Sequence, residues 1–144
     1  DVLRAMGGEL PAGIVAGSGF PWYSLDTPEA QKFVTSYFNA TGDQPLIGAM
    51  QGYNATYFLA EAIEKAGTTE TEAVVDALEG LIIDTPTGRT TMRAFDHQAD
   101  PMVWVGNSIQ SEDFPFPILV DLVAVPGSEV ILSVDEVKSR RAGQ

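Results

Sequence analysis

The segment GYNATYFLAEAIEKAG, residues 52–67, is the most regular part of the chain. Its apolar residues recur three and four positions apart, which is the spacing of one buried stripe on an α-helix. Glu61 and Lys65 lie on the opposite side as an i,i+4 pair, and Gly67 is a typical helix stop. The segment therefore predicts a helix from Tyr53 to Ala66. Its predicted buried stripe consists of Ala55, Phe58, Leu59, Ala62, Ile63 and Ala66.

The residues before this helix predict a strand, a loop and a second helix. Residues 13–16 form a short apolar run between glycines, which indicates a buried parallel strand. Residues 17–26 read as a loop. Thr27 and Pro28 supply an N-cap and a first-turn proline, and the helix they open should end near Gly42. We expect that helix to bury Phe33, Val34, Tyr37 and Phe38.

The residues after it become rich in β-structure. Thr69 and Glu72 have the spacing of a capping box, which predicts a short helix closed by Gly80. Beyond a turn at residues 85–88 the apolar pattern alternates, which predicts strands over residues 89–95 and 102–105, and the apolar run over residues 118–125, interrupted only by Asp121, predicts the strongest strand. The loop over residues 96–100 is a candidate hairpin, residues 114–117 form a stiff connector, and a second capping box, Ser133 with Glu136, opens a terminal helix. The fold class is α/β, with too few strands for a closed doubly wound sheet.

Composition excludes several functional classes. The net charge is −12, and the sole basic cluster, Lys138 with Arg140 and Arg141, fits a helix carboxy terminus, so nucleic acid is not an expected partner. The absence of cysteine removes disulfides, thiolate nucleophiles and cysteine-based metal sites. With 44% hydrophobic residues the 144-residue chain can form one packed core, and it has no apolar run of about 18 residues.

The first residues, 1–6, predict the tail of a helix closed by Gly7 and Gly8. They lack a basic start and an apolar signal core. We therefore expect the sequence to be a piece of a longer protein.

The motifs that would carry catalysis are weak. Asp96 could orient His97 as a general base, but adjacent residues of a strand point to opposite faces, and no nucleophile motif accompanies them. A turn histidine satisfied by the backbone is the simpler interpretation. Metal binding by these two residues with Asp100 is a weak pattern, and residues 17–19, Gly-Ser-Gly, lack the rest of a phosphate-binding motif. We predict no catalytic residue, metal or cofactor.

A ligand site is more plausible in the loop after the first strand. Phe20, Trp22 and Tyr23 follow the strand end, where open α/β sheets place ligands. Packing in the core or between lobes would account for these aromatics equally well. Glu9, just before the strand, could pair with an ammonium group or be an exposed turn residue.

Taken together, three segments resemble one family. Residues 52–67, then AVVDALEG at residues 73–80, then the turn at residues 85–88 followed by Arg93 and the triplet Asp96-His97-Gln98, are similar in order and spacing to type I periplasmic solute-binding proteins. Asn54 stands where the family more often has Asp. The resemblance implies that the chain is the carboxy-terminal part of a protein from the group that binds branched-chain amino acids or amides. It implies a two-lobed fold, incomplete in this chain, whose ligand is enclosed when the lobes close.

From the resemblance we expect residues 1–26 to end the second lobe, residues 27–80 to form helices returning to the first, and residues 81–144 to form the crossover and terminal helix. It also suggests ligand-binding roles for Glu9, on the ligand's ammonium, and for Trp22 and Tyr23 at the pocket mouth. The expected function is the extracytoplasmic solute-binding component of an ABC importer, non-enzymatic, with a branched-chain or aromatic amino acid or related carboxylate as ligand.

The expected partners are the permease subunits, with self-association of exposed helix faces as a further possibility. The expected location is periplasmic, or lipid-anchored through a missing amino terminus. A ligand-sensing domain of a regulator with the same fold is the alternative.

Overall fold

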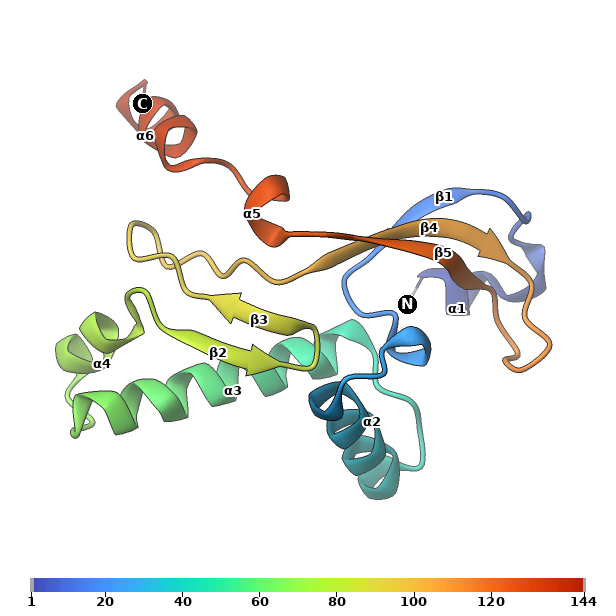
Figure 1. Ribbon diagram of the computed structural model, residues 1–144, viewed down its shortest axis with the longest axis horizontal. Helices are drawn as coiled ribbons and strands as arrows, with labels where there is room; N and C mark the ends of the chain where they lie inside the picture. The colour runs from blue at the N-terminus through green and yellow to red at the C-terminus, as the bar shows by residue number, and fades with distance from the viewer. Residues whose placement is uncertain (1, 144) are drawn as a thin grey trace.

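The chain forms a three-stranded antiparallel sheet, a group of helices beside a β-hairpin, and a projecting terminal helix (Figure 1). The computed structural model describes residues 2–143. In chain order its elements are α1 (Val2–Met6), η1 (Gly7–Glu9), β1 (Val15–Ser18), η2 (Trp22–Ser24), α2 (Pro28–Thr41), α3 (Ile47–Ala66), α4 (Thr71–Leu78), β2 (Ile82–Thr85), β3 (Gly88–Thr91), β4 (Val103–Ile109), β5 (Ile118–Val125), α5 (Gly127–Val130) and α6 (Val134–Ala142).

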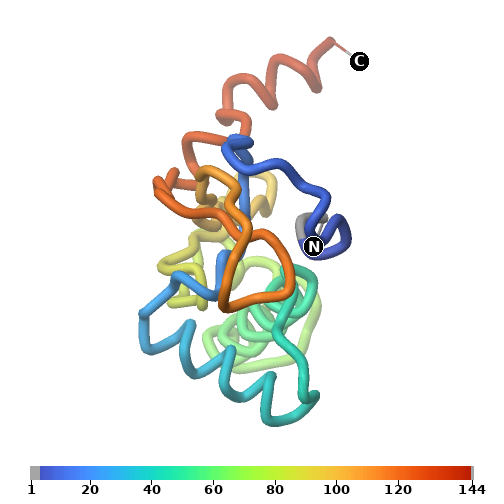
Figure 2. The backbone as a smooth tube through the Cα atoms, turned by 90° about the vertical axis from the view of Figure 1, so that its right-hand side faces the viewer, coloured from blue at the N-terminus to red at the C-terminus, as the bar shows by residue number. Residues whose placement is uncertain are grey.

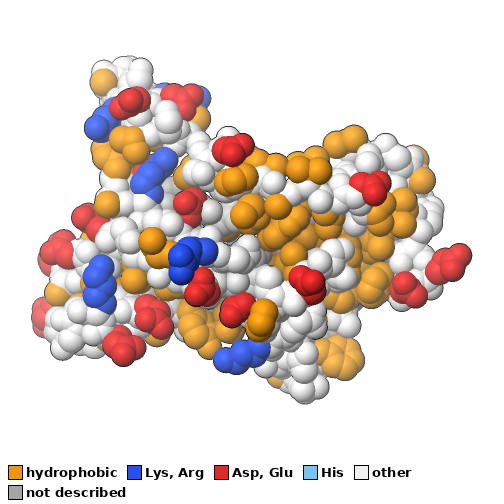
Figure 3. Space-filling model, in the orientation of Figure 1, with side chains coloured by type: hydrophobic (Ala, Val, Ile, Leu, Met, Phe, Trp, Pro, Cys, Tyr) orange, Lys and Arg blue, Asp and Glu red, His pale blue; other side chains and the backbone are white. Residues whose placement is uncertain are grey.

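The three-stranded sheet has the order β1-β4-β5, and β4 pairs antiparallel with both neighbours. The prediction of a buried parallel strand at residues 13–16 is wrong in position, direction and burial, since β1 begins at Val15 and the side chain of Val15 is 69% exposed. Its apolar composition reflects strand propensity, whereas burial depends on what packs over it. Val105 and Val123 are also exposed, and hydrophobic side chains gather over the sheet region in Figure 3.

Ser108 ties the entry of β1 to the middle strand. Its side chain is fully buried, its Oγ accepts the Ile14 N–H at 3.0 Å, and its hydroxyl donates to the Pro11 carbonyl at 2.8 Å. These bonds connect segments more than 90 residues apart in sequence.

The strand β5 has the predicted bounds and is bent at Asp121. That residue has φ of 52°, and the β4–β5 register shifts between Val105 and Asn107, as in a β-bulge. Opposite the bulge, a Cβ at Gly106 would lie 2.6 Å from the Val120 carbonyl oxygen. Only glycine allows this approach of the two backbones.

The helix α2 begins and ends as predicted. Thr27 Oγ1 accepts the Ala30 N–H at 3.3 Å, and Gly42, at φ of 73°, donates its N–H to the Phe38 carbonyl at 2.8 Å. Phe33 is buried, but the prediction that Phe38 is buried is wrong, because its side chain is 47% exposed on the uncovered side of the helix.

The helix α3 begins at Ile47, before the predicted start at Tyr53, and ends at Gly67 as predicted. Its predicted stripe is covered only in part: Phe58 and Ala62 are buried, whereas Leu59 is 50% exposed. Ala55 is exposed as well, since too few elements pack on that face. The predicted Glu61–Lys65 pair is not formed; the ammonium group of Lys65 instead donates to the carbonyl of Ala77 in α4 at 2.8 Å.

The hydrophobic core of the described residues includes two clusters. The first, at Phe20, Phe33 and Met50, joins the loop after β1 to α2 and α3. The second, at Ala62, Val74 and Ala77, joins α3 to α4. The helices α3 and α4 lie along one side of the hairpin, and α5 and α6 lie on the other side (Figure 1).

The predicted capping box at Thr69 is wrong. The helix α4 begins after Glu70, which offers no side-chain cap, and Thr68 Oγ1 accepts the Glu70 N–H instead. The turn predicted at residues 85–88 is confirmed: β2 and β3 form a hairpin in which the buried hydroxyls of Thr85 and Thr87 lie 2.9 Å apart.

The carboxy-terminal helix α6 has the predicted capping box, in which Ser133 and Glu136 bond each other reciprocally. That bonding lowers the pKa of the Glu136 carboxyl. The helix has no buried residue and projects from the rest of the chain in both backbone views (Figures 1 and 2). Arg93 links it to the body by donating to the Leu132 carbonyl at 2.6 Å.

Candidate functional site

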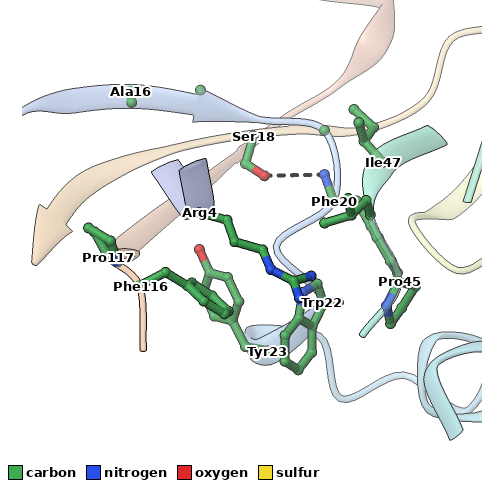
Figure 4. Close-up of a pocket in the computed structure, with 13 residues that line it drawn as sticks. Arg4, Ala16, Ser18, Phe20, Trp22, Tyr23, Pro45, Ile47, Phe116 and Pro117 are labelled. Carbon is green, nitrogen blue, oxygen red and sulfur yellow. Dashed lines mark hydrogen bonds between the residues drawn. The ribbon is translucent and has the colours of Figure 1, made fainter. Parts of the chain in front are cut away.

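A cavity of about 470 Å³ lies where β1 ends (Figure 4). This volume is within the range of small-molecule sites, and the wall is mostly apolar with few polar groups. It is lined by segments far apart in sequence: Arg4 of α1, residues 16–20 and 22–23, residues 45–47 at the start of α3, and Phe116 and Pro117 between β4 and β5.

The Gly-Ser-Gly run brings the helices to this cavity. A Cβ at Gly19 would lie 2.7 Å from Ile47 Cδ1, so the glycine lets the start of α3 approach the end of β1. Ser18 Oγ accepts the Phe20 N–H at 3.3 Å and stabilises the turn between them. This sequence therefore shapes the cavity wall through packing.

Two of the three residues predicted to bind ligand, Trp22 and Tyr23, lie together in the wall. Both also pack on Phe114, with ring centroids 5.3 Å and 5.9 Å apart. The hydroxyl oxygen of Tyr23 accepts the N–H of the buried Leu119 at 2.9 Å. Burial raises the pKa of the Tyr23 phenol, and the Leu119 bond partly opposes it. Core packing and a place in a ligand site are therefore both compatible with Trp22 and Tyr23, because their rings support the fold and also face the cavity.

Glu9, the third predicted residue, is exposed in η1 and is not part of the cavity wall. A role for Glu9 on a ligand's ammonium stays a prediction, without geometric support in the described residues.

Sequence reasoning missed Arg4 and Phe116. The Arg4 side chain points into the cavity (Figure 4), with its guanidinium carbon 5.6 Å from the centroid of the Phe116 ring. Its Nη2 donates to Asp43 Oδ1 at 2.8 Å. That bond, with a smaller contribution from the Gln44 N–H, lowers the pKa of the Asp43 carboxyl. Among the described residues of the wall, Arg4 is the one with a formal charge.

The catalytic Asp96–His97 pair, which the sequence made the weaker interpretation, is not assembled. His97 is a turn residue, with φ of 54°, and its Nε2 lies 3.3 Å from Glu79 Oε1. Its partner is thus a side chain, not the backbone as predicted. The Asp96 carboxylate accepts two hydrogen bonds from Arg93, at 2.7 and 2.6 Å, and this pairing lowers the pKa of Asp96. Within residues 2–143 no three His, Asp or Glu side chains are grouped as metal ligands would be.

A second cavity, of about 500 Å³, opens between α3 and the segment from β3 to β4. It is largely apolar, with Phe58, Met92 and Met102 in its wall. Asn54 also lines it, and the Oδ1 of Asn54 is buried without a hydrogen-bond partner. Among the described residues of this wall none carries a formal charge.

Comparison with known protein families assigns the chain to one of them. The profile of one family, described as periplasmic binding protein, matches residues 1–112. The chain belongs to this family. Among curated proteins no match was found.

Solved structures of the same kind confirm the α/β fold. A branched-chain amino-acid ABC transporter protein from Rhodopseudomonas palustris is 23% identical, with a TM-score of 0.81 over 92% of this chain. A solute-binding protein from the same species, solved with 3,4-dihydroxybenzoic acid, is 18% identical, with a TM-score of 0.72 over 85%. A leucine-, isoleucine-, valine-, threonine- and alanine-binding protein from Brucella ovis is 21% identical, with a TM-score of 0.71 over 90%.

The chain spans about a third of the length of these relatives, 34–35% of each. The expectation of an incomplete two-lobed fold is thereby confirmed. Within the described residues, no helix is long and apolar enough to cross a membrane.

Proposed function

We propose that this chain is part of the solute-binding component of an ABC importer and that it helps to enclose a small carboxylate ligand. The observation that carries the proposal is the cavity at the end of β1, with an apolar and aromatic wall, in a chain of the periplasmic binding protein family. Such a component binds and delivers its ligand without transforming it, so the role proposed here is non-enzymatic.

The ligand class follows from the wall and from the relatives. Trp22, Tyr23 and Phe116 offer flat apolar surface to an aliphatic or aromatic side chain, and Arg4 offers a cation to a carboxylate. Of the solved relatives, one is described as binding aliphatic amino acids and another holds an aromatic acid. A branched-chain or aromatic amino acid, or a related carboxylate, fits both features.

We also propose the lobe assignment given by the sequence: residues 1–26 end the second lobe, 27–80 return to the first, and 81–144 form the crossover. The cavity supports it, because its wall takes residues from each of the three ranges. A ligand bound there would contact all three segments and would favour their closed arrangement. Hydrogen exchange should therefore slow in all three ranges when ligand binds.

The importer assignment further implies an extracytoplasmic location and docking on membrane permease subunits. The closed, ligand-bound form would be the one that the permease recognises. Co-purification with the permease in the presence and absence of ligand would measure this preference.

A thermal-shift screen tests the function directly. Leucine, phenylalanine and benzoate would be compared, because a ligand that binds the folded form at 100 times its Kd stabilises it by about 2.7 kcal/mol. The active ligand should lose its effect in Trp22→Ala, within the cavity wall, and keep it in Phe38→Ala, on the exposed side of α2. If no carboxylate in the screen raises Tm, the proposed ligand class is wrong.

A further inference from the structure

Arg4 is held at the cavity by contacts with two distant segments. Its guanidinium carbon lies 5.6 Å from the Phe116 ring centroid, and its Nη2 donates to Asp43 Oδ1 at 2.8 Å. The Phe116 contact comes from the β4–β5 connection and the Asp43 contact from the α2–α3 loop. The cation is therefore placed by the tertiary structure rather than by α1 alone.

Most N–H donors of the Arg4 guanidinium remain free to bind a ligand. A guanidinium has five N–H donors in a planar fork that matches a carboxylate, and the contact with Asp43 uses one of them. The Arg4 side chain is 37% exposed, whereas the Asp43 side chain is 60% exposed and is not part of the wall. Asp43 therefore contacts Arg4 from outside the wall, and hydrogen-bond partners among the described residues account for one of the guanidinium's donors.

We infer that Arg4 is the carboxylate-binding and specificity-determining residue of this cavity, and that the preferred ligand is an aromatic carboxylate without an amino group. This inference rests on the proposed function and narrows its ligand class. The carboxylate would bind the Arg4 fork while the ring packs among Phe20, Trp22 and Phe116.

Within the described wall no anion faces the ammonium group that an amino acid would carry. An α-amino acid carries an ammonium group as well as a carboxylate, and enclosing an unpaired ammonium is costly. No carboxylate lines the cavity among the described residues, and Glu9 lies outside it. The start of α3, whose N-cap Leu46 offers no side-chain acceptor, borders the same cavity and adds the positive end of a helix dipole.

Asp43 would then be a competitor of the ligand. It neutralises Arg4 in the empty protein, so removing its charge should strengthen the attraction of Arg4 for an incoming carboxylate. If Asp43 instead paired with a ligand's ammonium, removing its charge would weaken binding. The sign of the Asp43→Asn effect therefore distinguishes the two ligand classes. Asn at this position keeps an oxygen for the Gln44 N–H, which Asp43 accepts at 2.7 Å.

Calorimetric titration of the protein with benzoate, benzamide, phenylalanine and leucine tests the inference. Benzoate should bind most tightly, and uncharged benzamide at least about tenfold more weakly, because benzamide has no negative charge and only one acceptor oxygen for the guanidinium. Arg4→Met keeps an apolar stem beside Phe116 but should weaken benzoate binding about tenfold or more. Asp43→Asn should tighten it. The control Arg89→Met, in an exposed pair with Asp84 outside the cavity, should leave it unchanged.

The outcomes separate the inference from the function that it refines. Tighter binding of leucine or phenylalanine than of benzoate, or full benzoate affinity in a folded Arg4→Met variant, would overturn the inference and leave the solute-binding function standing. Unchanged or weaker benzoate binding in Asp43→Asn would contradict the competition between Asp43 and the ligand for Arg4. Binding of none of the four probes would contradict the proposed function itself. Thermal melting of each variant establishes that it is folded.

Discussion

Replacing Tyr23 by Phe removes one oxygen and leaves the ring in the cavity wall. That oxygen accepts the Leu119 N–H at 2.9 Å, and Leu119 is 1% exposed, so water does not readily replace the lost acceptor. Leaving a buried donor unsatisfied costs about 1–3 kcal/mol. For a chain of this length such a loss lowers Tm by roughly 3–10 °C. Because the ring persists, the affinity for an aromatic ligand should change little.

Urea and thermal unfolding, followed by circular dichroism, measure the loss. The matched control is Tyr37→Phe, since Tyr37 is also half-buried and its hydroxyl has no hydrogen bond within the described part of the chain. It should change stability by less than about 0.5 kcal/mol. Equal melting temperatures for the two variants would refute the structural role of the Tyr23 hydroxyl. A strong loss of ligand affinity in Tyr23→Phe would show that the hydroxyl contacts ligand instead.

Three further perturbations test the sheet and the helices. Ser108→Ala removes the acceptor of the Ile14 N–H and should cost about 1–3 kcal/mol in urea unfolding. Gly106→Ala would place a Cβ 2.6 Å from the Val120 carbonyl oxygen, and the strain at the bulge should cost about 1–3 kcal/mol in the same assay. Burial, with a smaller contribution from its neighbour Tyr57, raises the pKa of Tyr53 to about 12. Because the phenol titrates later in the folded chain, its contribution to stability is full below about pH 10 and is lost as the pH rises to about 12. Unfolding at neutral and alkaline pH should show a smaller alkaline loss in Tyr53→Phe.

Each of these three variants has a control variant or an outcome that would contradict the prediction. Ser36→Ala, on the exposed side of α2, should leave stability nearly unchanged, and a loss equal to that of Ser108→Ala would contradict the hydrogen-bond argument. Gly52→Ala, where a Cβ meets no atom within 4 Å, should be neutral or slightly stabilising. An alkaline transition that is identical with and without the Tyr53 hydroxyl would contradict the pH argument.

Local features of the fold were predictable because local chemistry determines them. The N-cap at Thr27, the glycine stops at Gly42 and Gly67 and the bounds of β5 all follow from propensities within a few residues. The family was predictable from the order of three such segments. Burial was not, since the exposure of Val15 depends on which elements pack over it.

Residues of the site could be predicted from the sequence only where their immediate sequence neighbours indicate a site. Trp22 and Tyr23 were identified because they directly follow a strand end, a position that carries meaning in α/β folds. Arg4 was missed because its position beside Phe116, more than a hundred residues along the chain, is created by folding alone. No spacing within the sequence marks such a pair.

The terminal helix α6 is attached so lightly that it should have its own stability. It buries no residue, and its link to the body includes the Arg93 contact with Leu132 and the cations of Lys138 and Arg141 over the Phe95 ring. Few buried contacts mean a low free energy of local opening. Amide exchange of α6 should therefore run far ahead of that of β5, in a separate unfolding unit that opens and closes while the cavity keeps its shape.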